Sequence, residues 1–352
     1  MNRKNLAAVI LAALMLMLVL GGCGQSEPNT PSTTNIPAAT ERTVVDMAGR
    51  TVTLPAEINS VATFGAIGVI NTFVELFGEG NKIINQMSAS FTKTDKWKYQ
   101  YVFAPQIANG PVFENANREV QIEEVLAAKP DLCIVMTKET ATLLEEKGLT
   151  VTFLKWSELS DVEKCIGLLG EVFGKPDVAD DYLKYFDEKV AYAEKLTAGI
   201  PEAETKKVLY GNITSYTQPH IIAEWWIASA GGKSVTDNGR DAESYEYTVE
   251  DLLAWNPDIM FTTDKNMAEE IKGEARLKDV AAVNNDAIYM IPTVAHTWGN
   301  RTVEQPLTIM WTVNKLYPEI MSYEMLSKEI KYFYSHFFKT ELTDEQVKEI
   351  IG

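Results

Sequence analysis

The chain contains the same eleven-residue pattern twice. "IEEVLAAKPDL" occupies residues 122–132 and "VEDLLAWNPDI" occupies residues 249–259. Only two positions differ in chemical character, Ala128/Trp255 and Lys129/Asn256. In both copies apolar residues recur at helical spacing, a proline follows, and an apolar run then begins. The repeat therefore predicts one helix followed by one buried strand in each half of the chain.

Other segments around the two copies continue this alternation of strand and helix. In both halves, short apolar or β-branched runs that predict strands alternate with helical patterns that end at glycine. The runs that predict strands are "SVATFG", "KKVLYG", "DIMFTT" and "DAIYMIP". "IIAEWWIASAGG" predicts a helix, and "EEKGLTVTFL" predicts a helix followed by a strand. The helical spacing after the first of these runs covers 66–77. A hairpin around Gly49 precedes them, over 44–54. Alternating β and α elements imply parallel sheets covered by helices, which places the chain in the α/β class.

The middle of the chain has helical patterns and little strand signal. Residues 160–163 have the composition of a capping box and predict a helix that extends to Phe173. A longer helical pattern starts after Pro176 and ends before Gly199. We therefore expect two Rossmann-like lobes with mostly parallel sheets, joined by a long α-helix. The expected divisions are a signal peptide (1–22), a tether (23–41), a first lobe (42–157), connecting helices (158–200) and a second lobe with C-terminal helices (201–352).

The N-terminus has the features of an export signal. Arg3 and Lys4 precede an apolar run over 6–20, which is shorter than the roughly 20 residues that span a membrane. "LGGC" ends this run at Cys23 and resembles a bacterial lipoprotein box, which implies cleavage before Cys23 and lipidation of its thiol. An ordinary signal peptide or an uncleaved anchor is the alternative. The polar residues up to 41 predict a flexible tether, so we expect an extracytoplasmic protein that is lipid-anchored to the cell membrane.

Charge and cysteine content narrow the possible partners. The formal net charge is −17, from 49 Asp and Glu against 32 Lys and Arg. Such an acidic chain is unsuited to nucleic acid or to anionic membrane surfaces as direct partners. Besides Cys23, the cysteines are Cys133 and Cys165, each within an apolar or helical pattern. A disulfide between them is one alternative, and two buried free thiols are the favoured one.

Several of these features together resemble one protein family. The lipoprotein box, the Thr-rich tether, "DMAGRTVTLP", the two repeat copies and "EQPLTIMWTVNKLYPEI" are similar to the helix-linked substrate-binding proteins of ABC importers. That group serves ferric siderophores, haem, cobalamin and related metal chelates. The resemblance implies a periplasmic-binding-protein fold of the helical-backbone type. It also implies a monomer that holds its ligand between two lobes and delivers it to an ABC permease dimer with its ATPase.

The resemblance also gives the repeat a function. In the family, each lobe presents one surface glutamate near the start of the repeated helix, and the two glutamates dock on the two permease subunits. The matching residues are Glu123 and Glu250. A matched pair of carboxylates suits a receptor built from two similar subunits. The alternative is that both acids are favoured only by the helix dipole at a helix N-terminus.

The ligand is expected beyond the carboxyl ends of the strands, as in other open α/β folds. Four stretches there carry aromatic, histidine or arginine side chains: "TFGAIG", "KTDKWKYQYVF", "NITSYTQPHIIAEWW" and "TVAHTWGNRTVEQP", with "DAESYEYT" as a weaker fifth. The residues expected to contact the ligand are Phe64, Trp97, Tyr99, Tyr101, Tyr216, His220, Tyr245, His296, Trp298 and Arg301. For "TFGAIG" the alternative is a simple glycine turn, and for "KTDKWKYQYVF" it is a strand face. Core packing is the alternative for some of the other aromatic residues.

The histidine content limits the kind of metal ligand. The chain has 3 histidines, and one of them, His336, lies in the C-terminal helical region. A naked zinc ion needs about four protein ligands, so no direct metal site is expected. His220 or His296 can instead complete the coordination of a metal that a small chelator already holds. A ferric siderophore or a related iron complex is the favoured ligand, with haem, cobalamin, a nickel chelate and molybdate as alternatives.

An enzyme is not expected. The sequence contains no G-x-S-x-G, H-E-x-x-H, P-loop or G-x-G-x-x-G pattern. No cofactor is implied either. A surface adhesin or signalling module on the same fold is the non-transport alternative. Neighbouring genes for a permease and an ATPase would favour transport.

Overall fold

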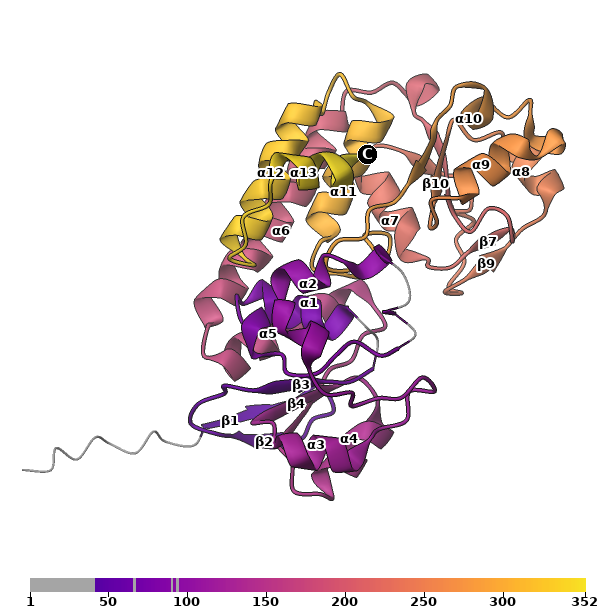
Figure 1. Cartoon of the computed structure of the whole chain (residues 1–352). Coiled ribbons are helices and arrows are strands. Elements are labelled where there is room, and N and C mark those ends of the chain that lie inside the picture. Colours follow the sequence, from indigo (N-terminus) through magenta and orange to yellow (C-terminus); the bar gives the residue numbers. More distant parts are fainter. Residues whose placement is uncertain (1–41, 66–67, 90, 93–94) are drawn as a thin grey trace, which may run out of the picture. The chain divides into compact units, whose positions relative to one another are not determined.

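The computed structural model describes residues 42–352, apart from 66–67, 90 and 93–94 (Figure 1). The predicted signal peptide, Cys23 and the whole predicted tether lie outside the described residues. The described residues belong to one compact unit by their internal contacts. Within the described residues, no helix has the length and apolar character needed to cross a membrane.

The first half of this unit contains five strands and five helices in the described residues. The strands are β1 (Arg42–Val45), β2 (Thr51–Leu54), β3 (Val61–Thr63), β4 (Leu132–Val135) and β5 (Val151–Phe153). The helices are α1 (Val69–Leu76), α2 (Gln100–Phe103), α3 (Ile122–Ala128), α4 (Lys138–Glu145) and α5 (Leu159–Phe173). Short 3-10 helices lie at Gly80–Lys82, Asp95–Trp97 and Pro105–Asn109.

The long helix α6 (Pro176–Thr197) leads into the second half. The strands there are β6 (Lys207–Gly211), β7 (Thr217–Gln218), β8 (Lys233–Ser234), β9 (Tyr245–Glu246), β10 (Ile259–Thr262) and β11 (Ile288–Met290). The helices are α7 (Ile222–Ser229), α8 (Val249–Trp255), α9 (Met267–Gly273), α10 (Ala281–Asn284), α11 (Gln305–Leu316), α12 (Tyr323–His336) and α13 (Asp344–Ile351). Further 3-10 helices lie at Glu202–Glu204 and Ala275–Leu277.

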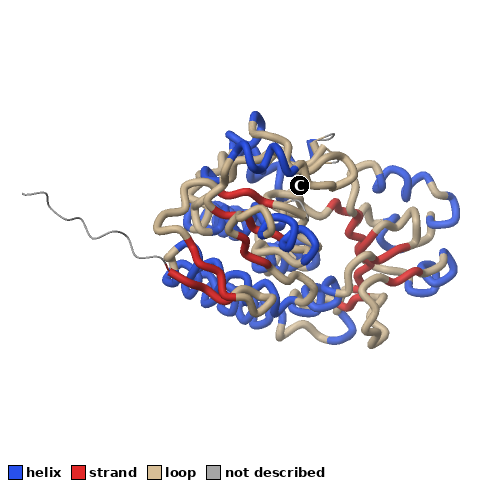
Figure 2. The backbone as a smooth tube through the Cα atoms, turned by 90° about the horizontal axis from the view of Figure 1, so that it is seen from below, coloured by secondary structure: helices blue, strands red, loops and turns tan. Residues whose placement is uncertain are grey.

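The strands form two parallel sheets, one in each half. The first has the order β3-β4-β5 and the second has the order β11-β10-β6-β8. The hairpin β1-β2 and the ribbon β7-β9 are antiparallel. Figure 2 shows two separate groups of strands with helices around each. Two parallel sheets with a long intervening helix confirm the predicted α/β class.

The repeated pattern forms the same helix-strand unit in both halves. The Asp131 carboxylate accepts hydrogen bonds from the backbone N–H groups of Asn59 and Ser60, at 2.8 and 2.9 Å, immediately before β3. The Asp258 carboxylate accepts one from the N–H of Lys207, at 2.8 Å, at the start of β6. Each aspartate therefore ties the beginning of its own strand to the beginning of the neighbouring parallel strand.

The copies share a backbone conformation at one position where their residues differ chemically, Lys129 in the first copy and Asn256 in the second. Lys129 and Asn256 end α3 and α8 in the left-handed region, with φ of 52° and 44°. Asn adopts this conformation more readily than Lys, because its short polar side chain bonds locally. The conformation at this helix end is therefore common to both copies although the residue is not.

Helices α5 and α6 correspond to the predicted connecting segment, with one correction. We predicted Ser160 as the cap of the first helix, but α5 already starts at Leu159. The Asp161 carboxylate accepts hydrogen bonds from the N–H groups of Ser157 and Glu158, which shifts the cap two residues toward the N-terminus. Helix α6 starts at Pro176, whose fixed φ suits a first helical position, and it has the predicted length.

One hydrophobic cluster contains residues of both halves. It includes side chains of α1, α5, α6, α7, α11, α12 and α13. Figure 1 shows α6 beside α11, α12 and α13. Two smaller clusters fill the space between the first sheet and α3 and α4, and between the second sheet and α8, α9 and α10. The helices around α6 therefore join the halves by a continuous core rather than by a bare linker.

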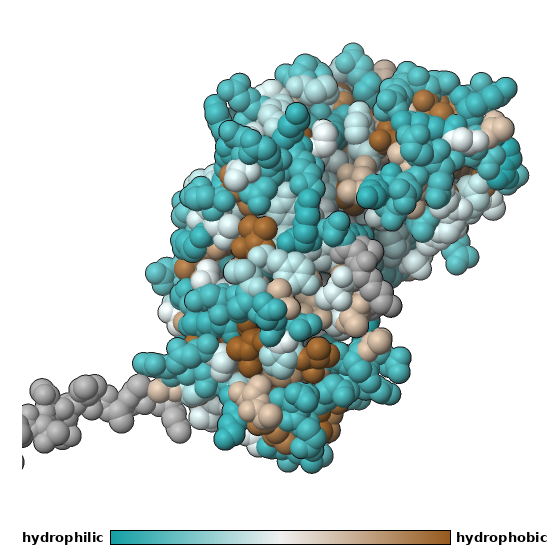
Figure 3. Space-filling view, in the orientation of Figure 1, coloured by the Kyte–Doolittle hydropathy of each residue, from teal (hydrophilic) through white to brown (hydrophobic). Residues whose placement is uncertain are grey.

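Both described cysteines are free and buried, as favoured above. Burial raises the pKa of the Cys133 thiol to about 12 and raises that of Cys165 further, so neither is reactive near neutral pH. On the face seen in Figure 3, hydrophilic residues predominate and hydrophobic residues occur in small separate groups.

We expect Asp131→Ala to lower the free energy of unfolding by about 1–3 kcal/mol, because two backbone N–H groups lose their acceptor. Asp258→Ala should have a smaller effect, since one such bond is lost there. Urea unfolding followed by circular dichroism measures both. Asp180→Ala removes an exposed carboxylate in α6 and is the matched control. Equal stability of Asp131→Ala and Asp180→Ala would contradict the structural role of the repeat.

Candidate functional site

Loops at the carboxyl ends of the two sheets meet each other. Trp156 follows β5, and its indole N–H donates to the carbonyl oxygen of Arg301 at 3.0 Å. The ring of His296, in the loop after β11, lies 5.4 Å from the ring of Trp97 and 6.0 Å from that of Trp156. A Cβ added at Gly68 would lie 3.0 Å from the Ala295 carbonyl oxygen, so the backbones approach closely there. The halves therefore converge at the strand ends where ligands bind in open α/β folds.

A buried hydrogen-bond chain crosses this meeting point. The Thr63 hydroxyl donates to the Asn71 side-chain oxygen at 2.7 Å, and the Asn71 amide donates to Gln100 at 3.0 Å. The Gln100 amide in turn donates to the carbonyl oxygen of Ala295 at 2.6 Å. Because buried polar groups are costly without partners, this chain fixes how the end of β3 meets the loop after β11.

Two buried glutamates lie beside this chain. The Gln100 amide reaches Glu75 at 3.4 Å. Glu304 accepts hydrogen bonds from the backbone N–H groups of 295–296, at 3.0 and 2.7 Å, and from the Tyr334 hydroxyl. Burial, reinforced by the charge of Glu304, raises the pKa of Glu75 well above its usual value. Burial also raises the pKa of Glu304, although its hydrogen bonds oppose this. We infer that Glu75 is the protonated member of the pair at neutral pH.

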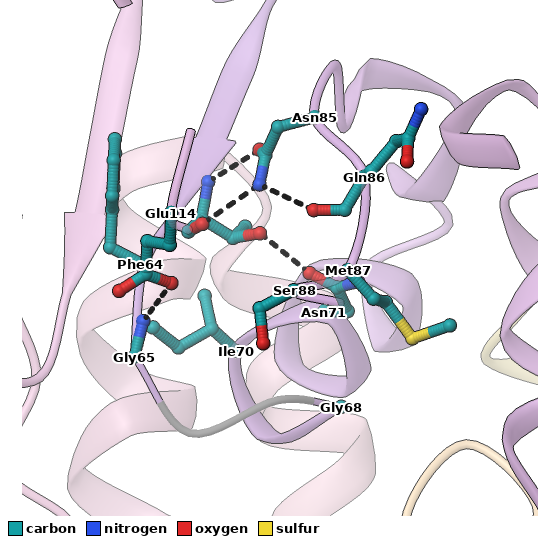
Figure 4. A pocket seen from close by; sticks show the side chains of 11 residues that line it. Phe64, Gly65, Gly68, Ile70, Asn71, Asn85, Gln86, Met87, Ser88 and Glu114 are labelled. Carbon is teal, nitrogen blue, oxygen red and sulfur yellow. Dashed lines mark hydrogen bonds between the residues drawn. The ribbon is translucent and has the colours of Figure 1, made fainter. Parts of the chain in front are cut away.

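A small pocket opens at the end of β3 (Figure 4). Its empty volume is about 270 Å³, part of it open to solvent. Its lining residues are Thr63, Phe64, Gly65, Gly68, Ile70, Asn71, Asn85, Gln86, Met87, Ser88 and Glu114. Among these described lining residues there is no Lys, Arg or His, so the pocket suits a neutral polar group better than an anion.

Side chains on either side of the β3 end shape this pocket. Phe64 forms one wall and stacks on Phe113 with 5.9 Å between ring centroids and 13° between planes. Asn85 exchanges two hydrogen bonds of 2.9 Å with the backbone of Thr63. Glu114 accepts the Gly65 N–H at 3.1 Å, and burial raises the pKa of this carboxyl group. The predicted residue Phe64 is therefore a fixed wall of the pocket.

A cluster of one arginine, one glutamate and one histidine lies at the carboxyl end of the second sheet. The Arg301 guanidinium donates two hydrogen bonds to the Glu243 carboxylate, at 2.7 and 2.6 Å. The Nδ1 of His220 lies 2.9 Å from the same carboxylate. The Arg301 bonds, aided by His220, lower the pKa of Glu243 despite its partial burial. The structure thus brings two sequence-predicted residues, His220 and Arg301, together around a carboxylate.

The two histidines near the site differ in what they can offer a metal. His296 is buried, and its Nδ1 accepts the N–H of Thr297 at 2.7 Å, which assigns the ring proton to Nε2. Burial lowers the pKa of His296 to about 3, so the ring stays neutral and has no free lone pair. His220 donates from Nδ1 to Glu243, which leaves the lone pair of Nε2 for a metal. His220 is therefore the better candidate to complete a chelate.

Several predicted aromatics are less exposed than expected. Trp97 and Tyr99 lie in a stretch for which ligand contact and a strand face were both open, and only 8% and 3% of their surfaces are exposed. The Tyr99 hydroxyl donates to the carbonyl oxygen of Gln346 in α13 at 3.2 Å. Trp298 is fully buried in the main hydrophobic cluster. Tyr99 and Trp298 thus pack against the protein itself.

The remaining predicted residues are partly buried. Tyr101 packs against the main hydrophobic cluster. Tyr216 lies beside β7, and its ring contacts that of Tyr247. Tyr245 is in β9, and its ring lies 5.0 Å from the guanidinium of Arg240. Tyr216 and Tyr245 therefore lie on the β7-β9 ribbon near His220, and their ligand contacts stay a prediction.

Sequence reasoning missed several residues of the site, chiefly Trp156, Gln100, Asn71 and Glu243. Trp156 follows a predicted strand, so the rule on strand ends applied to it as well. Glu243 lies in the weaker fifth stretch, where only tyrosines were singled out. Within the described residues, no group of three or more His, Cys, Asp and Glu side chains could hold a metal ion.

We expect Glu75→Gln to change how stability depends on pH. With its pKa raised in the folded state, Glu75 binds its proton more tightly when folded, so its contribution is complete below about pH 4.5 and declines as pH rises. The variant lacks this decline. As pH rises above 4.5, its free energy of unfolding should therefore increase relative to that of wild type by up to about 1.4 kcal/mol per pH unit. Urea unfolding at pH 5.5 and 8 measures this. Glu57→Gln, at an exposed site, is the control, and parallel profiles for Glu75→Gln and wild type would refute the assignment.

Comparisons with known proteins agree with this geometry. The family model described as periplasmic binding protein matches residues 85–295. The iron(3+)-hydroxamate-binding protein YxeB of Bacillus subtilis is 23% identical over 305 residues, which cover 81% of this chain and 87% of YxeB. The molybdate-binding protein MolA of Haemophilus influenzae is 23% identical over 352 residues, covering 88% of this chain and 94% of MolA.

Solved structures show the same fold. A periplasmic solute binding protein from Veillonella parvula superposes with a TM-score of 0.77 and 26% identity, over 88% of this chain and 97% of that one. Molybdate-bound MolA superposes with a TM-score of 0.71 and 19% identity, over 86% and 99%. Because the family model covers more than half of the residues and the parallel sheets agree, this chain belongs to the periplasmic binding protein family.

Proposed function

We propose that this protein is an extracytoplasmic solute-binding protein that captures a metal-related ligand between its two halves and delivers it to an ABC importer. The observation that carries this proposal is the convergence of loops from both sheets, in a member of this family, on a buried arginine and a histidine held by one carboxylate. The two relatives named above bind an iron-hydroxamate and molybdate, respectively. Binding without turnover is the expected activity.

Within this class, we favour a ferric siderophore or a related iron complex as the ligand. One histidine with a free Nε2 can fill an open position on a chelated metal, but it cannot hold a naked ion. Arg301 adds a positive charge for the oxygen donors of a chelator. Haem, cobalamin, a nickel chelate and molybdate are the alternatives. A surface adhesin or signalling module is the alternative outside transport.

We also propose that Glu123 and Glu250 dock on the permease dimer. Both are exposed in the first turn of the repeated helices α3 and α8. The structural ties of the repeat involve other residues, namely Asp131, Asp258 and the capping residue Asp251. The aspartates of the repeat therefore have a structural role within each half. The matched exposed glutamates Glu123 and Glu250 make none of these bonds, and a binding partner would explain why both copies carry them.

The N-terminal sequence supports a proposal on the cellular setting. We propose that the mature protein begins at Cys23 and is anchored through a lipid on that residue. A mature chain that retains 1–22 would contradict this. We further propose a monomer, as the resemblance to the helix-linked substrate-binding proteins implies.

Titration of tryptophan fluorescence tests the ligand class. Trp97 and Trp156 flank His296 where the halves meet, so ligand entering there should change their emission. We expect a saturable response to at least one of a ferric trihydroxamate, a ferric chelate with open coordination positions, haem, cobalamin, nickel–histidine or molybdate. His220→Ala should weaken binding of the open ferric chelate about tenfold or more, which is about 1.4 kcal/mol. His336→Ala, in α12, is the control; no response to any probe would refute the proposal.

Uptake by cells tests the docking surface. Glu123→Ala combined with Glu250→Ala should abolish uptake of the bound ligand and leave its affinity unchanged, because the two acids lie outside the ligand loops. Glu139→Ala with Glu270→Ala, at exposed positions of α4 and α9, is the matched control and should retain uptake. Loss of affinity in the first double variant would place these acids in the binding site instead.

A further inference from the structure

We propose that Glu243 is a built-in competitor of the ligand: its carboxylate occupies Arg301 and His220 when the site is empty and is displaced by an oxyanion group of the ligand. This inference rests on the proposed function, because it assigns the chemistry that the same site recognises. The group displaced and the group bound share one feature, negatively charged oxygens that accept hydrogen bonds from a guanidinium. Glu243 would then weaken the binding of every ligand that presents such oxygens, and only a ligand that outcompetes its carboxylate would occupy Arg301.

Arg301 has the properties of a binding residue rather than of a surface charge. Its side chain is only 9% exposed, whereas that of Glu243 is 47% exposed. A charge buried to that extent is costly without a partner, and both terminal nitrogens of Arg301 donate to the single Glu243 carboxylate. The Nε of Arg301 has no hydrogen-bond partner in the described part of the chain. Arg301 therefore retains one buried donor that the Glu243 carboxylate does not satisfy.

The loop that carries Glu243 is fixed at its base and exposed at its tip. The Arg240 guanidinium donates to Gln218 and to the carbonyl oxygen of Thr236, both at 2.6 Å, and also to Glu224 of α7. Residues 241–244 are exposed. Glu243 can thus turn toward solvent without disturbing the buried bonds of Arg240. Arg301, in contrast, is held by its own loop, which bonds to Trp156.

Three strand ends supply the cluster. His220 follows β6 and β7, Glu243 follows β8, and Arg301 follows β11 of the same sheet. Ligand groups entering at this edge meet the Glu243–Arg301 pair first through the exposed carboxylate. An anionic ligand would be repelled as long as that carboxylate stays in place, whereas an uncharged one would not.

The first test uses sulfate as a probe, with no assumption about the natural ligand. Melting temperatures of wild type and Glu243→Gln are compared in sulfate and in chloride at equal ionic strength. We expect sulfate to stabilise Glu243→Gln at concentrations about tenfold lower than for wild type, since ligand binding to the folded state raises its stability. Adding Arg301→Gln should abolish this gain. Glu246→Gln, in β9, removes the same charge from an exposed position and is the matched control.

Identical sulfate responses of Glu243→Gln, Glu246→Gln and wild type would overturn the inference. A gain that persists with Arg301→Gln would overturn it as well. The alternative of a purely structural ion pair predicts only a lower melting temperature for Glu243→Gln, in sulfate and in chloride alike.

The second test uses ligands of different charge. Glu243→Gln should bind molybdate or haem, with its carboxylates, about tenfold more tightly than wild type, and a neutral ferric trihydroxamate with unchanged affinity. An equal increase in affinity for anionic and neutral probes would also overturn the inference. It would indicate that the Glu243 side chain hinders ligands sterically rather than through its charge. If no chelate binds either protein, the proposed function fails, while the sulfate response still decides the role of Glu243.

Discussion

The buried hydrogen-bond chain centred on Gln100 is the constraint on which the site depends. Its members come from β3, α1 and α2 of the first half and from the loop after β11 of the second. If the halves separated at this point, several buried donors and acceptors would lose their partners at once. The chain therefore keeps Trp97 and Trp156 opposite His296 and positions the loop that carries Arg301.

The core supports the same arrangement on a larger scale. The main hydrophobic cluster continues from α1 and α5 through α6 to α11 and α12. Wide separation of the halves would expose part of this cluster, at a cost of about 25 cal/mol for each square ångström of apolar surface. Local movements of exposed loops, such as residues 241–244, carry no comparable cost. Ligand entry through loop movement suits this architecture better than a wide hinge opening.

The glutamates near the site differ in protonation state because their surroundings differ. Glu243 stays ionised because Arg301 and His220 surround it, whereas burial beside Glu304 favours the protonated form of Glu75. A protonated Glu75 adds a hydrogen-bond donor to the interior without a charge. Glu243 instead balances the positive charge of Arg301 at the edge of the cluster. Glu75 thus contributes to the contact between the halves, whereas Glu243 takes part in ligand selection as proposed above.

The sequence by itself determined the α/β class, the doubled helix-strand unit, the long helix α6 and the loops that surround the site. These properties follow from the spacing of apolar residues and from turn residues, which act over a few positions along the chain. The rule on strand ends singled out His220, His296 and Arg301, and in the structure Arg301 and His220 lie against one carboxylate. Their roles in ligand binding stay predictions.

Only the tertiary structure decided where the side chains of those loops point. Glu243 meets Arg301 across 58 positions of the chain, and Trp156 meets the same residue across 145. Tyr99 packs against α13, which begins more than two hundred positions later, and Trp298 enters the common core. Local spacing carries no information about such distant partners, because they are set by how the two sheets and the C-terminal helices pack together.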